Sequence, residues 1–189
     1  MRTHCFGGKN IIEAHVPSWE EWIPRLLGEL EASRSRIQTS HRIGGRWENS
    51  YLPVELVPSV RSPMRFARDL GKGELNLSPL ILFKPPPFSG NAFPPFWFNL
   101  SFPGEETGLH DHARESLLSA VAYLACVEDS GNLFFRTQGE SDLEVVPEVG
   151  KIVLFDPSIK HGVRRNESSS ERVSLAFNLF PFPLPTDGL

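Results

Sequence analysis

The fold is decided by residues 150–180, whose sequence is GKIVLFDPSIKHGVRRNESSSERVSLAFNLF. Ile152–Phe155 is a short run of β-forming apolar residues, and Asp156-Pro157-Ser158 is a turn in which proline presets φ. A second strand is predicted at Ile159–Arg164, followed by a polar loop and a third strand at Arg172–Phe180. The segment is typical of strands joined by short turns.

The third of these strands has two distinct faces. Successive side chains of a strand point to opposite sides, so Arg172 and Ser174 point the same way. Both faces are partly apolar, and the alternation does not show which one faces inward. If the strand that carries His161 lies beside them, one small cavity holds a candidate metal ligand, a cation and a hydroxyl. The first face comprises Arg172, Ser174, Ala176 and Asn178, and the second Val173, Leu175, Phe177 and Leu179.

The whole second half of the chain predicts short strands separated by turn signals. Such a series is typical of a sandwich, a jelly roll or a barrel, so the fold is predicted to be mainly β. The run Leu117–Val127 is ambiguous, since its alanines also suit a helix. The predicted strands are Phe96–Phe102, Gly108–His112, Leu117–Val127, Asn132–Arg136, Leu143–Val146, Lys151–Phe155, Ile159–Arg164 and Arg172–Phe180.

The first half of the chain is expected to flank this core. A short strand is predicted at Asn10–Val16, and a helix follows with Ser18 as N-cap and Glu21 completing a capping box. No repeat or linker divides the 189 residues, so we expect a single domain, 1–189. Its parts are a helical or irregular flanking part at about 1–95, the core at about 96–180 and a tail at 181–189.

Charge and cysteine content limit the partners and the location. The formal net charge is −4, whereas a binder of nucleic acid or of a membrane surface would show a basic stripe, so neither is an expected partner. Cys126 lies in an apolar run and is expected to be a buried free thiol, which suits a reducing compartment. The N-terminus lacks an apolar signal core, so a cytoplasmic location is expected. A helix-flanked barrel would allow a homodimer, but the sequence does not give the oligomeric state.

Three histidines carry the predicted chemistry. His110 and His112 form an H-x-H motif, and residues i and i+2 of a strand face the same side, so both imidazoles can reach one ion. His161, in a distant strand, would complete three ligands on one face and leave the open positions that a catalytic metal needs. H-x-H alone is a weak signal. Arg172 and Ser174 strengthen it, because an inward guanidinium is costly without an anionic partner and a small dicarboxylate would supply one.

These motifs, in this order, resemble a known family. Between about Asn99 and Asn178 the chain resembles the Fe(II)- and 2-oxoglutarate-dependent oxygenases, most closely a branch with an H-x-H motif. The resemblance implies a double-stranded β-helix, that is a jelly-roll or cupin-like barrel, with flanking N-terminal helices. It also implies a dioxygenase that couples 2-oxoglutarate decarboxylation to the oxidation of a substrate. The matching pieces are His110-Asp111-His112, Ser119-Ala120-Val121-Ala122-Tyr123, Gly150 through Phe155-Asp156-Pro157 to His161-Gly162-Val163, and Arg172-Val173-Ser174.

The resemblance also assigns the metal ligands. It implies Fe(II) bound by His110 and His161, with the third ligand two positions after His110. Most members of the family have a carboxylate there, whereas this chain has His112. Asp111 is the fallback, although on a regular strand it faces away and only a bulge would bring it in.

The remaining implied roles concern the cosubstrate. Arg172 and Ser174 would hold the distal carboxylate of 2-oxoglutarate, and Asn99 and Tyr123 would help to position it. Dioxygen would be the second small partner. The primary substrate, whether an amino acid, another metabolite or a protein side chain, cannot be read from the sequence.

A three-histidine site leaves other functions open. Such a site also suits Zn(II). The alternative is a cupin-like metal protein that does not use 2-oxoglutarate, such as a thiol dioxygenase, a zinc hydrolase or a non-enzymatic sensor. Arg172 and Ser174 separate the hypotheses, since a plain three-histidine site needs no clamp for a dicarboxylate.

Overall fold

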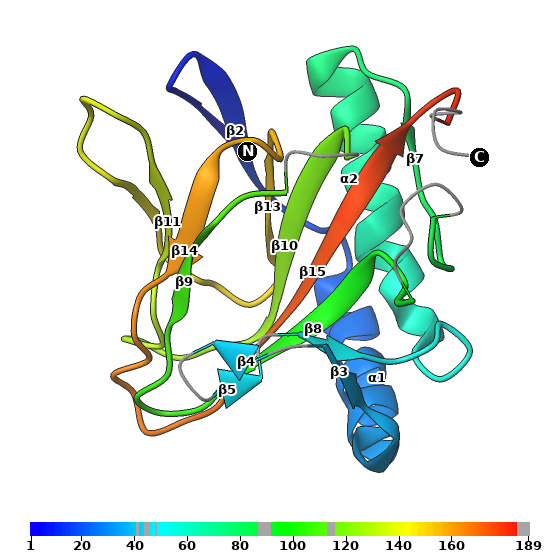
Figure 1. Cartoon of the computed structure of the whole chain (residues 1–189). Helices are drawn as coiled ribbons and strands as arrows, with labels where there is room; N and C mark the ends of the chain where they lie inside the picture. The colour runs from blue at the N-terminus through cyan, green and yellow to red at the C-terminus, as the bar shows by residue number, and fades with distance from the viewer. Residues whose placement is uncertain (41, 44–45, 48, 87–91, 113–115, 185–189) are drawn as a thin grey trace.

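The computed structural model describes residues 1–40, 42–43, 46–47, 49–86, 92–112 and 116–184 of the chain (Figure 1). The helical elements are α1 (Trp19–Ala32), η1 (Arg34–Arg36), η2 (Pro58–Val60) and α2 (Arg61–Leu75). The strands are β1 (Arg2–Phe6), β2 (Lys9–His15), β3 (Gln38–Thr39), β4 (Arg42–Ile43), β5 (Arg46–Trp47), β6 (Ser50–Tyr51), β7 (Pro79–Leu80), β8 (Phe96–Ser101), β9 (Thr107–His110), β10 (Leu118–Ala125), β11 (Leu133–Arg136), β12 (Leu143–Val145), β13 (Lys151–Phe155), β14 (Lys160–Val163) and β15 (Arg172–Pro181).

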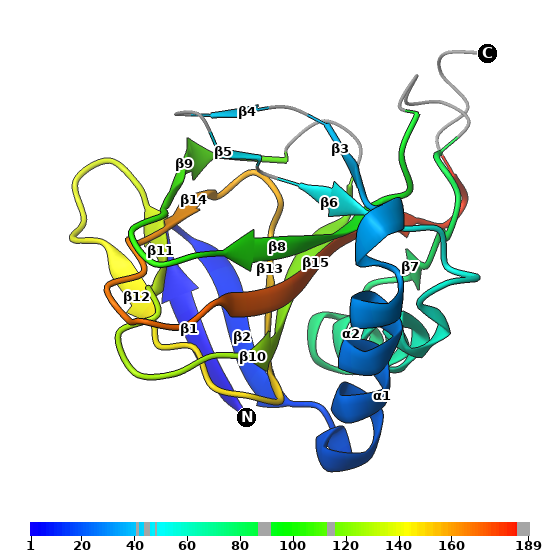
Figure 2. The same ribbon diagram turned by 90° about the horizontal axis from the view of Figure 1, so that it is seen from below.

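Two antiparallel sheets face each other. The major sheet has the order β1-β2-β13-β10-β15-β8-β6-β3, with β7 paired to β15, and the minor sheet has the order β12-β11-β14-β9. Figures 1 and 2 show the minor sheet on one side of the major sheet and both α-helices on the other. This arrangement confirms the predicted mainly β fold, a double-stranded β-helix with flanking helices.

The strands of the second half lie where the sequence predicts them. All eight are present, with ends that differ by at most a few residues. The ambiguous run forms β10, which pairs with both β13 and β15 in the middle of the major sheet. A central strand is buried on both faces, which explains why its small and apolar residues show little alternation.

The N-terminal segment contributes more to the sheet than expected. The sequence predicts one short strand at 10–16, whereas β1 and β2 form a hairpin and residues 11–15 of β2 pair with β13. β1 was missed because its sequence, RTHCF, has no apolar alternation. The predicted tail, 181–189, begins in the last residue of β15, and residues 185–189 lie outside the described part of the chain.

The helices cover the outer face of the major sheet. One core cluster combines Trp22, Leu26 and Leu30 of α1 with Leu175 and Phe177 of β15, so the apolar face of β15 points toward the helices. A helix after residue 18 was expected and α1 confirms it. The predicted cap is wrong in detail, however: the side chain of Ser18 makes no capping hydrogen bond and its φ is 50°.

Two smaller expectations concern cysteines and membranes. Both cysteines are free, but Cys126 is only half-buried, since it follows the end of β10 and is not inside the strand. No helix in the described ranges is long and apolar enough to cross a membrane.

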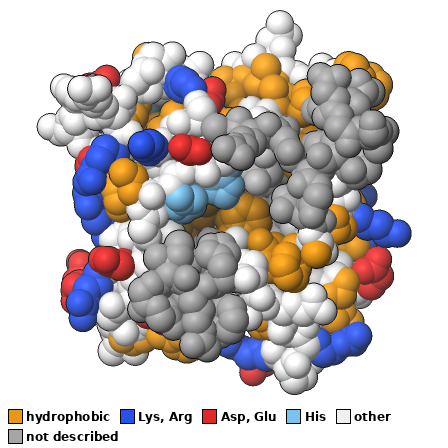
Figure 3. All heavy atoms as spheres, in the orientation of Figure 1, with side chains coloured by type: hydrophobic (Ala, Val, Ile, Leu, Met, Phe, Trp, Pro, Cys, Tyr) orange, Lys and Arg blue, Asp and Glu red, His pale blue; other side chains and the backbone are white. Residues whose placement is uncertain are grey.

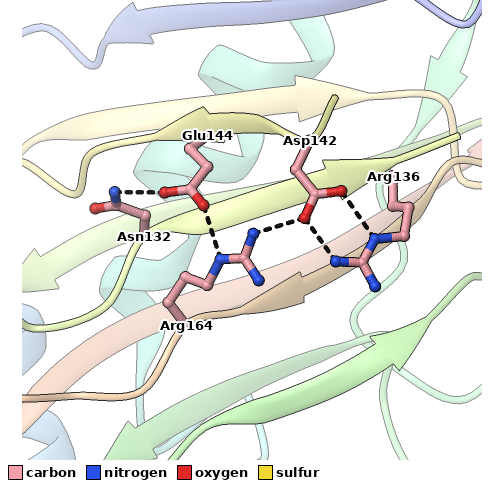
Figure 4. A network of polar contacts seen from close by, with 5 residues as sticks. All are labelled: Asn132, Arg136, Asp142, Glu144 and Arg164. Carbon is pink, nitrogen blue, oxygen red and sulfur yellow. Dashed lines mark hydrogen bonds and ion pairs between the residues drawn. The ribbon is translucent and has the colours of Figure 1, made fainter. Parts of the chain in front are cut away.

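The outer face of the minor sheet carries a network of ion pairs (Figure 4). Asp142 accepts from Arg136 and from Arg164, each with a shortest distance of 2.6 Å, and Glu144 accepts from Arg164 Nε at 2.7 Å. Arg136, first, and Arg164 lower the pKa of Asp142 to about 2. Because such exposed pairs are screened by solvent, the network aligns β11, β12 and β14 more than it stabilises the fold.

A glycine beside His161 lets these strands pack closely. A Cβ at Gly162 would lie 2.8 Å from the ring of Phe134 and 2.8 Å from the carbonyl oxygen of Thr107. Gly162 pairs with Phe134 across β11 and β14, so the aromatic ring occupies the space that a side chain would need. This contact fixes the strand that carries His161.

We predict opposite effects for the same substitution at two glycines. Gly162→Ala should destabilise the protein by about 1–3 kcal/mol, because the new methyl group overpacks the site. Gly28→Ala, inside α1 with no atom within 4 Å of the new Cβ, should stabilise it by up to about 1 kcal/mol. Urea unfolding of both variants measures the difference, and equal stability of the two would contradict the packing described for Gly162.

Candidate metal and cosubstrate site

The structure brings the three predicted histidines together. His110 ends β9 and His161 lies on β14, where the two are cross-strand partners. His112 lies two residues beyond the end of β9, and its main-chain N–H donates to Pro157 O at 2.8 Å. One nitrogen from each of the three rings lies within 4.8 Å of the others. Strand pairing thus brings His110 and His161 together, although β9 and β14 are far apart in the sequence.

Backbone carbonyls orient two of the rings. His110 Nδ1 lies 2.8 Å from Gly108 O, and His161 Nδ1 lies 2.9 Å from Ile159 O. A carbonyl oxygen can only accept, so in both rings Nδ1 carries the hydrogen and Nε2 keeps its lone pair. Such a contact on the far nitrogen is typical of histidines that ligate metals.

Ring stacking holds the third histidine. The rings of His112 and Trp97 are stacked with centroids 5.4 Å apart and an interplanar angle of 6°. His161 in turn packs against the edge of Phe155, with centroids 4.7 Å apart. These contacts restrict the rotation of both imidazoles.

The electrostatics favour neutral imidazoles. Burial, and then the neighbouring His110, lower the pKa of His161 to about 3 and that of His112 to about 4. Neutral imidazole is the form that binds a metal, so both rings can act as ligands at neutral pH without first losing a proton.

Asp111, the fallback ligand, lines the same cavity but is not part of the cluster of ring nitrogens. Its side chain is exposed, and its carboxylate is not among the atoms that cluster within 4.8 Å. The alternation along the chain explains this placement, since residue i+1 points away from the side that i and i+2 share. The register shift in the pairing of β9 with β14 lies before His110, between Thr107 and His110, and does not bring Asp111 into the cluster.

The predicted cosubstrate residues form one row across the major sheet. Ser174 on β15 pairs with Tyr123 on β10 and with Asn99 on β8. Arg172 precedes Ser174 by two residues on the same face and is 1 % exposed. Its Nη1 donates to Ser130 O and Gly131 O, both at 2.9 Å, which fixes the guanidinium. The alternation of β15 therefore places its polar face between the sheets.

These groups line a single cavity of about 340 Å³ between the two sheets. Histidine side chains reach the surface near the middle of the face shown in Figure 3, beside hydrophobic side chains. The lining residues include His110, His112, His161, Asn99, Tyr123, Arg172 and Ser174. All seven predicted site residues thus meet at one place.

Sequence reasoning missed several polar residues of this cavity, among them Asn178 and Ser119. Asn178 lies on the same face of β15 as Arg172 and Ser174, and Ser119 is its cross-strand partner on β10. The period-2 alternation in the sequence already placed Asn178 on the same face of the strand as Arg172. It was overlooked because only the face, and not its orientation, could be derived.

Comparison with known proteins agrees with this geometry. A family model described as "Putative 2OG-Fe(II) oxygenase" matches residues 137–178, the segment that contains His161, Arg172 and Ser174. This match covers less than a quarter of the chain, and over that segment it agrees with the resemblance seen in the sequence. No curated protein matches the chain.

Solved structures are similar over most of the chain. A Pseudomonas putida prolyl-4-hydroxylase is 19 % identical with a TM-score of 0.63, covering 90 % of this chain and 92 % of its own. A Trichoplax adhaerens prolyl hydroxylase, solved with a peptide fragment of the hypoxia-inducible factor oxygen degradation domain, is 11 % identical with a TM-score of 0.66 and coverages of 90 % and 83 %. HygX from Streptomyces hygroscopicus, solved with nickel and 2-oxoglutarate bound, is 14 % identical with a TM-score of 0.60 and coverages of 92 % and 83 %. At these identities the similarity shows a shared fold.

The placement of Asp111 and His112 predicts which of them binds a metal. His112→Ala should weaken Mn(II) binding by more than the roughly 10–100-fold that is typical of changes outside the ligand shell. Asp111→Ala should weaken Mn(II) binding far less, because its carboxylate lies outside the cluster of three ring nitrogens. Titration followed by the EPR signal of free Mn(II) measures both. A strong loss in Asp111→Ala with full binding in His112→Ala would reverse the assignment.

The burial of Tyr123 predicts its behaviour in alkali. Burial raises the pKa of its phenol well above the usual value of about 10. The unfolded chain therefore loses this proton at a pH where the folded chain keeps it, so folding stability should fall as the pH rises above about 10. Wild type and Tyr123→Phe should develop the same phenolate absorbance while both stay folded. One extra phenolate in the folded wild type near pH 10 would contradict the burial.

Proposed function

We propose that this chain is an Fe(II)- and 2-oxoglutarate-dependent dioxygenase that oxidises a substrate not yet identified. The single observation that supports it most is the composition of one cavity. Three imidazoles lie at one end, and a buried guanidinium with a hydroxyl lies deeper between the same two sheets. A metal chelate with a free distal carboxylate would use both groups at once.

The histidines fit the proposed metal. His110 and His161 each present Nε2, since their Nδ1 atoms bond to carbonyls, and His112 closes the same cluster. Three protein ligands on one face leave positions for other molecules, which distinguishes catalytic from structural metal sites. Nitrogen ligands suit Fe(II) and also Zn(II), so the donor set does not by itself select the metal.

The other end of the cavity fits the proposed cosubstrate. A guanidinium binds a carboxylate through two parallel hydrogen bonds, and a neighbouring hydroxyl adds a third. Arg172 and Ser174, two residues apart on β15, supply these groups, while Asn99 and Tyr123 flank Ser174 on the adjacent strands. Tyr123 stays protonated at neutral pH, so it can donate a hydrogen bond to an anion but adds no negative charge.

The chain itself orients the reactants and excludes water. When bound, Fe(II) and 2-oxoglutarate would supply the oxidising chemistry, in which the cosubstrate is decarboxylated to succinate and the substrate is oxidised by dioxygen. Arg172 and Ser174 would fix the distal end of the cosubstrate so that its other end faces the histidines. Val121 and Ala176 line the wall beside them and keep it apolar. Gly108 O and Ile159 O would keep the rings of His110 and His161 oriented toward the metal.

Removing the charge of Arg172 should separate cosubstrate binding from metal binding. A hydrogen bond to a charged group contributes about 1.5–3 kcal/mol, so Arg172→Met should weaken 2-oxoglutarate binding by about 10–150-fold. Mn(II) affinity should stay unchanged, because Arg172 does not touch the histidine cluster. Calorimetric titration of the Mn(II)-loaded protein with 2-oxoglutarate measures the first value, and titration with Mn(II) the second.

Two further variants keep this test decisive. Ser174→Ala removes only the hydroxyl and should weaken 2-oxoglutarate less than Arg172→Met does. Arg165→Ala, on an exposed arginine that pairs with Glu167, is the matched control and should change neither affinity. Equal losses of metal and cosubstrate in Arg172→Met would mean that Arg172 only supports the fold. Binding of Mn(II) without any binding of 2-oxoglutarate by the wild type would favour the metal protein that does not use this cosubstrate.

A further inference from the structure

The three histidines are not held in the same way. His110 and His161 place Nδ1 against backbone carbonyls, which can only accept a hydrogen bond. The Nδ1 of His112 instead faces a side-chain amide, that of Asn178, at 3.4 Å. An amide can present either an oxygen or an NH₂ group, so His112 is the one ring of the three whose tautomer depends on a side chain.

The side chain and the backbone of Asn178 both make hydrogen bonds within the major sheet and its flanking loop. It lies on the polar face of β15, and its cross-strand partner Ser119 on β10 donates a hydrogen bond from Oγ to Asn178 Oδ1 at 2.7 Å. The backbone N–H of Asn178 donates to Pro95 O at 2.9 Å. The side chains of Ser119, Asn178 and His112 therefore form a chain of polar contacts that ends at the cluster of three histidines.

With the Asn178 amide oriented so that Nδ2 faces the ring, Nε2 of His112 has no lone pair for a metal. Asn178 Nδ2 is a donor, so His112 Nδ1 must accept, which places the ring hydrogen on Nε2. At 3.4 Å this contact is also longer than a typical hydrogen bond. Stacking on Trp97 also hinders a 180° flip of the His112 ring, which would exchange the positions of its two nitrogens.

Reversing the amide removes this conflict. Asn178 Oδ1 would then accept from His112 Nδ1–H, and the lone pair of Nε2 would become available, as it is in His110 and His161. Asn178 Nδ2 would donate to Ser119 Oγ, which a hydroxyl accepts as readily as it donates. Both orientations use the same atom positions, since an amide oxygen and an amide nitrogen differ little in size.

We propose that Asn178, supported by Ser119, is a positioning residue of the metal site, and that its amide selects the tautomer of His112 that binds the metal. The inference rests on the proposed function, because it takes His112 as a ligand. Metal binding at His112 is coupled to reversal of the Asn178 amide. The Asn178 amide thus accepts the Nδ1 hydrogen of His112, as backbone carbonyls accept those of His110 and His161.

Two substitutions at Asn178 test this in opposite directions. Asn178→Leu keeps a similar volume but offers no acceptor, so it should weaken Zn(II) binding by about 10–100-fold, as is typical of partners behind a ligand. Asn178→Asp offers only acceptor oxygens and should bind Zn(II) at least as tightly as the wild type. Competition with a chromophoric chelator measures these affinities with Zn(II), a diamagnetic probe of the same site. Ser119→Ala should fall between the wild type and Asn178→Leu.

The tautomer gives a readout that does not depend on catalysis. Long-range ¹H–¹⁵N spectra of the metal-free protein should show His112 with hydrogen on Nε2 in the wild type and on Nδ1 in Asn178→Asp. Zn(II)-loaded wild type should show hydrogen on Nδ1. This measurement needs only the nearly isosteric Asn178→Asp, so it decides the question even if Asn178→Leu does not fold.

The control and the contrary results are equally specific. Asn132→Leu makes the same change on the outer face of the minor sheet, where Asn132 bonds Glu144, and should leave Zn(II) affinity unchanged. Wild-type affinity in Asn178→Leu, or equal losses in the Leu and Asp variants, would overturn the role of Asn178. If the wild type itself bound no metal, the proposed function would fail instead, which separates the two conclusions.

Discussion

The alternation of side chains along β15 is the constraint on which the site depends. Its apolar residues pack against α1 and the rest of the helical layer, which fixes the orientation of the strand. The other face is then forced between the two sheets, carrying Arg172, Ser174 and Asn178 into one cavity. A slip of one residue would exchange these faces and bury the apolar set in the cavity, so the register that builds the core also builds the site.

Strand pairing supplies the rest of the geometry. β14 pairs with β9 so that His161 lies opposite His110, and the neighbouring strands of β15 add Tyr123 and Asn99 beside Ser174. The hydrogen-bond ladders of two sheets therefore position groups that are far apart in sequence. Local contacts then refine single atoms: carbonyls fix two imidazoles, stacking on Trp97 fixes the plane of the third, and backbone carbonyls hold Arg172.

Much of this could be predicted from the sequence, for identifiable reasons. The strands of the second half were found because their runs are short, apolar and separated by clear turns, and the three histidines were found because H-x-H on a strand has a fixed geometry. The first strand of the N-terminal hairpin was missed, since β1 lacks alternation and is held by pairing with β2. The orientation of β15 could not be derived either, because both of its faces contain apolar residues. Without that orientation, the contact of Asn178 with His112, which joins the two sheets, could not be predicted.

The proposed function requires one cavity to bind a metal and a dicarboxylate together. Thermal unfolding with Mn(II), with and without 2-oxoglutarate, tests it most directly. A ligand present at ~100 times its dissociation constant stabilises the folded state by about 2.7 kcal/mol, and for a chain of this size each kcal/mol raises the melting temperature by about 2–4 °C. 2-Oxoglutarate should add a shift of roughly 5–11 °C, and only when Mn(II) is present. A shift with Mn(II) that 2-oxoglutarate does not increase would contradict it and leave a three-histidine metal protein without this cosubstrate.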